Sequence, residues 1–576
     1  MAAAGLAVLS LAGVAFCFAW AWRKVRFYAR EDTPLPYILL VGGVWWLGVV
    51  AVGVLLPMDV ATAGSGSSKA MLALWKTNYW VTFICCWVIC PIASAYWTSG
   101  AFTWKRRLRS ALLSNLKFYA RVLVVLALIF ALVLMHQGFQ FSKVTGFLIA
   151  AANAYGLFLV VVMLGYGLVE MPREIWEKTC PRRMLDYHYC SAPQTEEALM
   201  DAQADLLDVL DAVERFECPQ DLMLQAHYDE VRSKAKNARE TCLDERTSMS
   251  HRTRRTSVDS TGGRGSMSAL EHLHSRLKNA IIKAERAKFQ WQSLLDVTEQ
   301  LEAEVKLLET PASSLYQRLD GGGLDASIEE AQGGIDASGL GVDETGASSR
   351  GPPRRLTLYY KALKALYAVM VLLSVILIWN ECASAISSEA SVFGLMVRFA
   401  GNFFTRWLCC VLPLSYIAAC VYVALFKFKL LDQLTLYGNR QTDVSNLLFN
   451  ASYVGRVQFS LGVNYTTQLV TEDRQSLAFY SLIGDMDVVP FLGSAFNFYL
   501  PVLILLLSAC TYFRVFDRLL NVVGIETHTE PGEGGQSQDL VAQGQQLVAR
   551  HRARLERRRG RDAEAAEERS FSLRQF

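Results

Sequence analysis

The chain has 576 residues, of which 52% are hydrophobic and 19% are charged, and the charged residues cluster between long apolar blocks. This composition is typical of a membrane protein with several spans and excludes an ordinary soluble globular chain. The net charge of +3 is too small to indicate a nucleic-acid partner, so the positions of the Lys and Arg residues matter more than their sum.

Nine apolar blocks are long enough to cross a bilayer, which takes about 20 mostly apolar residues in a helix. We predict spans at residues 3–22, 37–56, 79–98, 118–135, 146–169, 363–379, 407–426, 444–465 and 491–513. No basic segment precedes the first block, which favours a retained span; a cleaved signal peptide is the alternative. The eighth block is the weakest because it carries Arg456, and an Arg at the bilayer centre costs about 3 kcal/mol unless it faces protein or water. The pattern predicts an all-α, polytopic helical membrane protein with membrane domains 1–169 and 363–513.

Basic residues gather in three loops, after the first, third and seventh predicted spans. They are Arg23, Lys24, Arg26, Arg30, Lys105, Arg106, Arg107, Arg109, Lys427, Lys429 and Arg440. Loops rich in Lys and Arg stay on the cytosolic side of a membrane. We therefore expect the N-terminus outside and, with nine spans, the C-terminus in the cytosol. The plasma membrane is the compartment we expect first, with an endosomal or lysosomal membrane as the alternative.

The apolar blocks stop between residues 170 and 362, and two helical patterns replace them, at about 196–218 and 269–309. In the second, apolar residues recur at alternating spacings of three and four, the a/d seam of a coiled coil. The seam comprises Leu270, Leu273, Leu277, Ala280, Ala284, Ala287, Trp291, Leu294, Thr298, Leu301, Val305 and Leu308. We predict a cytosolic loop in which the two segments pair antiparallel and which binds cytosolic or membrane signalling proteins. Ordinary amphipathic helices packed on the membrane domain are the alternative.

Two segments of this loop, 247–268 and 311–353, are too polar to bury a core and are predicted to be disordered linkers. The first contains Ser257 two residues after Arg255, a spacing that suits a basophilic kinase of the cyclic-AMP-dependent type. Ser257 is therefore the candidate phosphorylation site.

The C-terminal segment, 514–576, is a basic tail on a helix-favouring background. Its Arg residues stand at 550, 552, 554, 557, 558, 559 and 561. Attraction to an anionic membrane surface is worth about 1 kcal/mol for each basic residue near the lipid, so anionic lipid is the expected partner. A solvated helix is the alternative.

The motifs of catalysis are absent: the chain carries no phosphate-binding glycine loop, no nucleophile elbow and no zinc-protease helix motif. The eight His residues lie outside the predicted span interiors, where an intramembrane haem or zinc site would need them. We predict no enzyme, no cofactor and no metal. Polar residues of the membrane domain are the candidates for a ligand path or for interhelical hydrogen bonds, namely Asn153, Glu381, Arg456 and Asn497. Asn464 begins an Asn-Tyr-Thr sequon at the outer end of the eighth span and is the glycosylation candidate.

Several runs resemble the limb-region (LMBR-domain) membrane proteins, also called the lipocalin-interacting membrane receptor (LIMR) family. They include AANAYGLFLVVVMLGYGLVEMPREIW at 151–176, SLIGDMDVVPFLGSAFNFYLPV from Ser481 and DLVAQGQQLVARHRARLERRR from Asp539. The resemblance extends over nearly the whole chain and is strongest to the subgroup of LMBR domain-containing protein two. It implies nine spans, an outside N-terminus and a cytosolic coiled-coil loop after the fifth span. For this subgroup it also implies a place in G-protein-coupled receptor signalling, the adrenergic pathway in particular, and it supplies no catalytic residue.

We therefore expect a non-enzymatic multi-pass membrane protein that modulates receptor signalling or trafficking through its loop at 170–362. The alternative is a transporter, or an accessory subunit of one, that uses the intramembrane polar residues.

Overall fold

The computed structural model describes residues 2–63, 69–137, 141–216, 222–243, 266–309, 354–386, 390–427, 435–483, 493–515, 518 and 535–574. Among these residues every regular element is a helix, apart from one isolated bridge between Ala29 and Thr442, which confirms the predicted all-α class. The chain folds into two compact units. The membrane unit comprises Met1–Pro172, Ala198–Phe289 and Met370–Glu526, and the tail unit comprises Arg173–Glu197, Gln290–Val369 and Thr527–Phe576.

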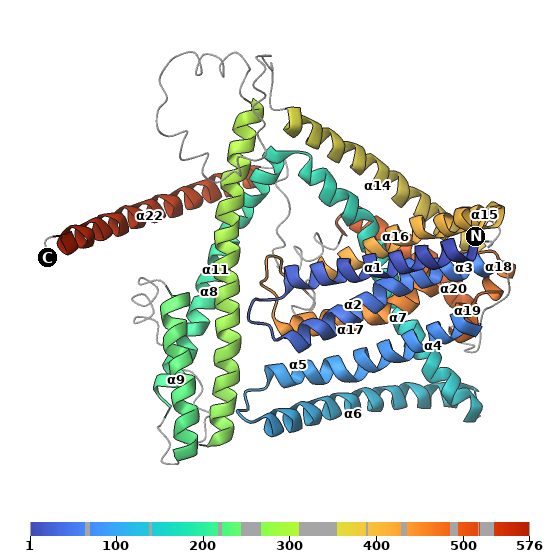
Figure 1. Ribbon diagram of the computed structural model, residues 1–576, viewed down its shortest axis with the longest axis horizontal. Coiled ribbons are helices and arrows are strands. Elements are labelled where there is room, and N and C mark those ends of the chain that lie inside the picture. The colour runs from blue at the N-terminus through green and yellow to red at the C-terminus, as the bar shows by residue number, and fades with distance from the viewer. Residues whose placement is uncertain are drawn as a thin grey trace. The chain divides into compact units, whose positions relative to one another are not determined.

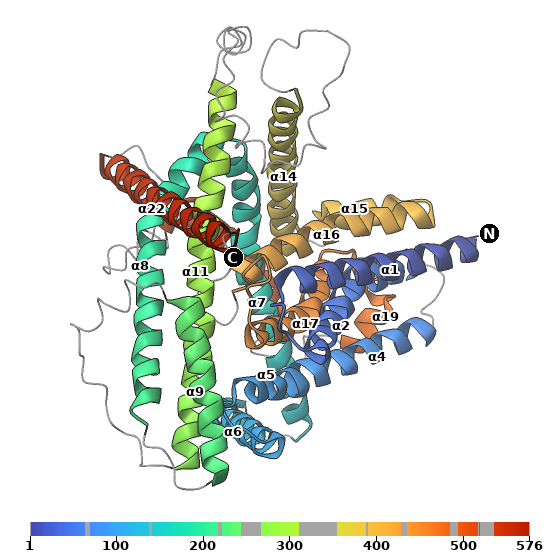
Figure 2. The ribbon, with the colours of Figure 1, turned by 60° about the vertical axis from the view of Figure 1, so that its left-hand side comes forward.

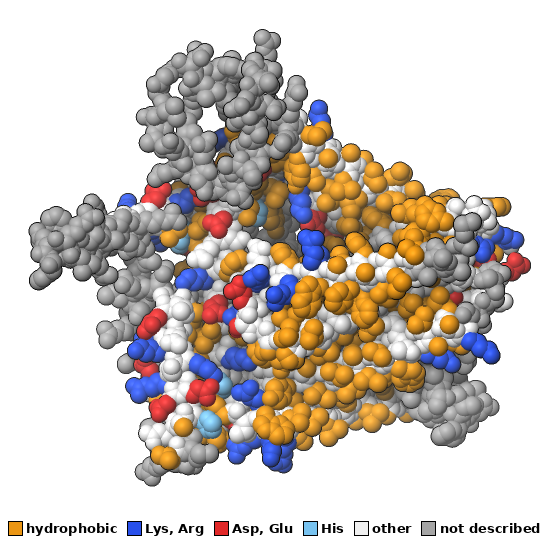
Figure 3. Space-filling view, in the orientation of Figure 1, with side chains coloured by type: hydrophobic (Ala, Val, Ile, Leu, Met, Phe, Trp, Pro, Cys, Tyr) orange, Lys and Arg blue, Asp and Glu red, His pale blue; other side chains and the backbone are white. Residues whose placement is uncertain are grey.

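The apolar blocks and the short segments between them form helices α1 to α7 and α14 to α20 (Figure 1). They are α1 (Ala2–Tyr28), α2 (Leu35–Val50), α3 (Leu56–Thr62), α4 (Lys69–Ile84), α5 (Cys90–Thr98), α6 (Trp104–Gln137), α7 (Phe141–Lys178), α14 (Arg354–Ile386), α15 (Val392–Phe399), α16 (Phe403–Lys427), α17 (Val444–Thr467), α18 (Thr471–Gln475), α19 (Ala478–Ile483) and α20 (Gly493–Tyr512). In the described part of the chain, seven helices are long and apolar enough to cross a membrane, counting α2 with α3 and α4 with α5 as one helix each. Neither α17 nor α20 is among the seven, so the count of nine spans stays a prediction. Figure 3 shows hydrophobic side chains spread over the face that α1, α2, α5 and α6 present.

Two of these long helices contain a π-helical turn that ends two residues before a proline. The turns are Ala51–Leu55, ahead of Pro57, and Cys85–Ile89, ahead of Pro91. A proline inside a helix has no N–H to donate, and its ring clashes with the carbonyl four residues earlier. The wider turn, in which each N–H bonds to the carbonyl five residues back, makes room for the ring and lets the helix continue. It also leaves a backbone carbonyl group without a donor in its own helix; that of Cys86 accepts from Arg456 of α17.

Helix α17 lies against α2, α4, α5 and α16 and is mostly buried. Its buried residues include polar ones, namely Asn450, Ser452, Gln458, Ser460 and Asn464. Because most of α17 faces protein instead of lipid, it does not need an apolar surface, which explains its weak hydropathy. Small residues bring its neighbours close: a Cβ at Gly455 would lie 2.3 Å from Cys86 Sγ, and one at Gly462 would lie 2.7 Å from the Phe479 ring.

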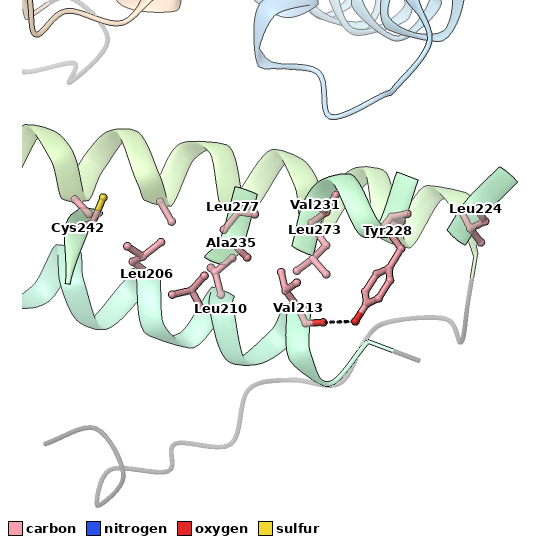
Figure 4. Close-up of a cluster of buried hydrophobic side chains, with 14 residues drawn as sticks. Leu206, Leu210, Val213, Leu224, Tyr228, Val231, Ala235, Cys242, Leu273 and Leu277 are labelled. Carbon is pink, nitrogen blue, oxygen red and sulfur yellow. Dashed lines mark hydrogen bonds between the residues drawn. The ribbon is translucent and has the colours of Figure 1, made fainter. Parts of the chain in front are cut away.

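Three helices of the long loop pack together in the membrane unit: α8 (Pro181–Glu214) from Ala198 onward, α9 (Leu222–Cys242), and α11 (Met267–Glu309) up to Phe289. Figures 1 and 2 show α9 beside α11. The shared core, drawn in Figure 4, consists of Leu206, Val209, Leu210, Val213, Leu224, Tyr228, Val231, Ala235, Cys242, Leu270, Leu273, Leu277, Ala280 and Ala284. The predicted apolar positions of 196–218 and 269–309 therefore do meet, but α9 lies in the same core and was not predicted.

The polar linkers fall almost wholly outside the described residues. The first of them ends inside α11, which begins at Met267, and the second, 311–353, is not described at all. The buried a/d positions of α11 fit the predicted seam. A coiled coil in the strict sense stays a prediction.

The basic tail forms α22 (Gly535–Arg574), which belongs to the tail unit. Arg552 donates to Glu302 on α11 at 2.9 and 3.0 Å and to Thr298 Oγ1 at 3.0 Å. A Cβ at Gly544 would lie 2.0 Å from the Tyr189 carbonyl oxygen, so this position requires glycine. One face of α22 therefore packs against other parts of the protein, while Arg554, elsewhere on the same helix, is exposed.

Candidate functional site

The long loop meets the membrane helices at the connection between α5 and α6. We call this contact the docking face and define it by residues 97–102 on one side and His274, Ser275 and Lys278 of α11 on the other. Gly100 makes the approach possible, because a Cβ there would lie only 1.9 Å from the Glu271 carbonyl oxygen. No other residue type fits this position without moving α11.

The C-terminal end of α5 is capped by side chains of α11. The last carbonyl groups of a helix have no partner within it, and donors or cations placed there are favourable. Ser275 Oγ donates to the Thr98 carbonyl oxygen at 3.0 Å, and Lys278 Nζ donates to the Trp97 carbonyl oxygen at 2.8 Å. The end of a membrane helix is thus completed by residues far along the chain.

An aromatic stack fills the space beside this cap. The Phe102 ring lies between His227 of α9, at 4.3 Å, and His274 of α11, at 4.9 Å, with nearly parallel planes. His274 Nδ1 lies 2.9 Å from the Gly100 carbonyl oxygen, which only accepts, so Nδ1 carries the proton. His274 Nε2 lies 3.3 Å from Lys234 Nζ and accepts from it. Burial lowers the pKa of His274, so the imidazole is neutral in the docked state.

Lys278 links the docking face to α17. Its ammonium lies 3.8 Å from the centroid of the Trp97 ring, and Trp97 Nε1 donates to Asp443 Oδ1 at 3.0 Å. Asp443 caps the N-terminus of α17, since its Oδ2 accepts from the Ser445 N–H at 3.0 Å. Burial lowers the pKa of Lys278 to about 8. A continuous path of polar contacts therefore joins α11 to α5 and α17.

Two ion pairs flank the docking face. Arg30 Nη2 lies 2.8 Å from Glu285 Oε2, and Arg106 Nη1 lies 3.4 Å from Glu271 Oε1. Arg30 is largely shielded from solvent, and its pairing with Asp32 and Glu285 raises its pKa against the opposing effect of burial. Both acidic partners belong to α11, and both arginines come from predicted basic loops.

A separate polar network lies inside the bundle between α14 and α17. Glu381 Oε1 accepts from Asn464 Nδ2 at 2.9 Å and from Gln468 Nε2 at 2.7 Å. Asn380 Nδ2 donates to Gln468 Oε1 at 2.6 Å, and Asn380 Oδ1 accepts from Ser391 Oγ at 3.0 Å. All five side chains are buried. Among the described residues, the side chains that bond to this carboxyl group are the amides of Asn464 and Gln468, and none is a cation.

Of the residues singled out from the sequence, Glu381 and Asn464 come together in this network. Arg456 occupies a different position on α17, against the Trp87 ring. Asn153 and Asn497 lie in α7 and α20, but their side chains are outside the described residues, and so is Ser257. In the part of the chain that is described, no group of three or more His, Cys, Asp and Glu residues could hold a metal.

The docking residues were not predicted. Phe102, His274 and Lys278 stand in no motif, although His274 and Lys278 share one face of a helix at a spacing of four. That spacing is common on solvated helices, so the sequence offered only a weak signal.

The chain matches the family of LMBR1-like membrane proteins over residues 5–516. It is similar to the G-protein coupled receptor-associated protein LMBRD2 of Gallus gallus, with 25% identity over 84% of this chain and 70% of the relative. The same protein of Homo sapiens is 25% identical over 84% of this chain and 69% of the relative. The LMBR1 domain-containing protein 2 homolog A of Dictyostelium discoideum is 26% identical over 80% of this chain and 60% of the relative. No solved structure matches the chain.

Proposed function

Because the chain belongs to the family of LMBR1-like membrane proteins, we propose that it is a non-enzymatic membrane protein that modulates G-protein-coupled receptors, of the adrenergic type, through the loop between α7 and α14. The names of the relatives, which are G-protein coupled receptor-associated, support the receptor class. For this chain, the structural support for the proposal is the docking face, because it gives the loop a fixed attachment to the membrane helices.

The proposed route runs through the cap on α5. Lys278 and Trp97 connect α11 to Asp443 at the start of α17, so a movement of α17 is transmitted to α11. Gly100 leaves no free space to absorb such a shift. A receptor or signalling protein bound to α9 or α11 would thereby respond to a movement of the membrane helices, or would itself cause one.

The cytosolic placement of the loop and of the C-terminus is part of the proposal, as is the plasma membrane as its compartment. Arg30 and Arg106 support the placement, since they come from basic loops and pair with Glu285 and Glu271 of α11. Binding of anionic lipid by the tail remains proposed for Arg554 and its exposed neighbours. A tag at the N-terminus should be reached by antibody on intact cells and a tag at the C-terminus only after permeabilisation; two tags on one side would exclude the arrangement.

The decisive experiment separates the loop from its attachment. Gly100→Val places a side chain against the α11 backbone and should release the docking face, whereas Gly43→Val in α2, where no atom lies within 4 Å of a built Cβ, is the matched control. Proximity labelling in cells expressing a panel of G-protein-coupled receptors should lose receptors in Gly100→Val and keep them in Gly43→Val. Equal labelling by the two variants, with equal surface expression, would refute the proposal.

A transporter or an accessory subunit is the second candidate, and the Glu381 network is the observation that favours it. A buried carboxylate held by neutral amides is a group that can take up and release a proton. Proton-coupled flux in reconstituted vesicles that is present in the wild type and absent in Glu381→Gln would support this function over the first.

A further inference from the structure

A cavity of about 60 Å³ lies where the π-helical turn after α4, α7 and α17 meet. Its walls include Tyr79, Phe83, Trp87, Tyr155 and Arg456. Five of the eleven lining residues are aromatic, and the one charged group among the eleven is the guanidinium of Arg456. The cavity is separate from the docking face and from the Glu381 network.

The Arg456 side chain is held in place by the π-helical turn. Cys90 N–H bonds to the Cys85 carbonyl across this turn, and Pro91 has no N–H, so the Cys86 carbonyl has no donor within its own helix. Arg456 Nη2 supplies that donor at 3.0 Å. The guanidinium carbon also lies 3.9 Å from the centroid of the Trp87 ring, which fixes its plane.

The positive charge of Arg456 has no counter-charge in the described part of the chain. Its contacts there are the Cys86 carbonyl and the rings of Trp87 and Tyr453, and no carboxylate lies within ion-pair distance. Its Nε is buried and has no hydrogen-bond partner, and neither has Thr82 Oγ1 on the wall of the same cavity. Arg456 is only partly buried, but a guanidinium inside the bundle whose Nε is buried and unbonded and which has no counter-charge is costly, so an anion in the cavity would be bound favourably.

The depth of the cavity restricts which anion can reach it. Arg456 is twelve residues from Val444, the first residue of α17, which is about 18 Å along the helix axis. The hydrocarbon core of a bilayer is about 30 Å thick, so if α17 crosses it as the sequence predicts, Arg456 lies near its middle, far from the phosphate groups of phospholipids. Phe83 and Tyr155 are 38% and 42% exposed beside the cavity, on the apolar outer surface of the bundle. The anion must therefore arrive from the lipid and carry an apolar chain.

We propose that this cavity binds the carboxylate of a single-chain fatty acid, with the acyl chain lying against Phe83 and Tyr155. A carboxylate is small enough for the cavity and matches the fork of N–H groups that Arg456 presents through Nε and Nη2. A fatty acid crosses the hydrocarbon core in its neutral form; on pairing with Arg456 its carboxyl group passes its proton to a water molecule, which carries it to bulk solvent, and the carboxylate and the guanidinium form the ion pair. Thr82 Oγ1 is placed to donate to the second oxygen.

The test uses the purified full-length protein in phosphatidylcholine nanodiscs and a palmitic acid that carries a diazirine and an alkyne on its chain. A hexadecanol with the same groups is the matched probe without a carboxylate. We expect the acid to label peptides from 79–87 and 453–460 about tenfold more than the alcohol does, because only the acid forms charge-assisted hydrogen bonds with Arg456. Arg456→Gln should reduce labelling by the acid to that by the alcohol. Arg26→Gln, whose arginine lies over Trp22 outside the cavity, should leave it unchanged.

Two results would overturn the proposal. Equal labelling of the wild-type protein by acid and alcohol would show that the carboxylate is not recognised, whatever the folding of the variants. Loss of acid labelling in nanodiscs that contain phosphatidic acid would show that a phosphate headgroup is the preferred occupant.

Discussion

The side-chain nitrogen of Asn464 donates to the Glu381 carboxylate at 2.9 Å, and it is the same nitrogen to which an N-linked glycan would be joined. Both residues are buried. We predict that occupancy of the sequon and formation of this bond exclude each other. An endoglycosidase mobility shift should be found in the aggregated material and be lost from the monodisperse fraction in size-exclusion chromatography. Asn450→Gln should leave the pattern unchanged, and a glycan on Asn464 in folded protein would contradict the prediction.

Glu381 should tolerate a change to Gln and not a change to Ala. Glu381→Ala leaves the buried amides of Asn464 and Gln468 without their acceptor, at about 1–3 kcal/mol each, and adds a cavity. Glu381→Gln keeps an oxygen where both amides donate and should stay within about 1 kcal/mol of the wild type. Thermal unfolding in detergent, followed by intrinsic fluorescence, measures both. Similar losses for the two variants would show that the charge itself stabilises the fold.

The docking face should loosen in acid. Burial lowers the pKa of His274 below its ordinary value of 6.5, so the docked state binds fewer protons than the released state. Neutral His274 contributes fully to the stability of the docked state above about pH 6.5. This contribution is lost as the pH falls through the lowered pKa. Protection of the α11 amides, measured as the exchange rate relative to the intrinsic rate at each pH, should therefore fall between about pH 7 and pH 5. His274→Gln keeps a donor for Gly100 and should flatten this dependence; His227 remains in both proteins, so an unchanged profile would assign the effect elsewhere.

Ser257 stays the proposed regulatory site of the loop. A phosphate adds about −1.5 to −2 charges, and Arg254 and Arg255 are near enough in sequence to pair with it. Ser257→Glu and Ser257→Ala should change partner binding in opposite directions without changing surface expression. Mass spectrometry after cyclic AMP is raised tests the modification directly, and an unmodified Ser257 would end the proposal.

The helices could be predicted from the sequence more accurately than the contacts between them. Apolar length identified most of the membrane helices, and the spacing from Leu270 to Leu308 identified α11, because burial of one helix face imposes a local pattern. Helix α9 was missed because its apolar residues, such as Tyr228 and Val231, are few among many charged ones. Its mean polarity resembles that of a linker.

The docking face could not be predicted, for a different physical reason. Gly100 and Glu271 are far apart in the chain, and their fit depends on the height at which α11 passes the end of α5. Neither residue differs in type from those of an ordinary turn or a solvated helix. The charge of Arg456 was visible from the sequence, but the Cys86 carbonyl that holds it became available only through the π-helical turn.

The burial of polar residues in α17 has a consequence for biosynthesis. A helix that carries Asn450, Gln458 and Asn464 enters lipid poorly when it emerges alone from the translocon, whereas α2 and α5, which cover it in the folded protein, are made hundreds of residues earlier. Its insertion therefore depends on a binding site that the first half of the chain must already have assembled. Substitutions in α2 or α5 that widen this site should be recognised by quality control in the endoplasmic reticulum as a failure of α17, far from the altered residue.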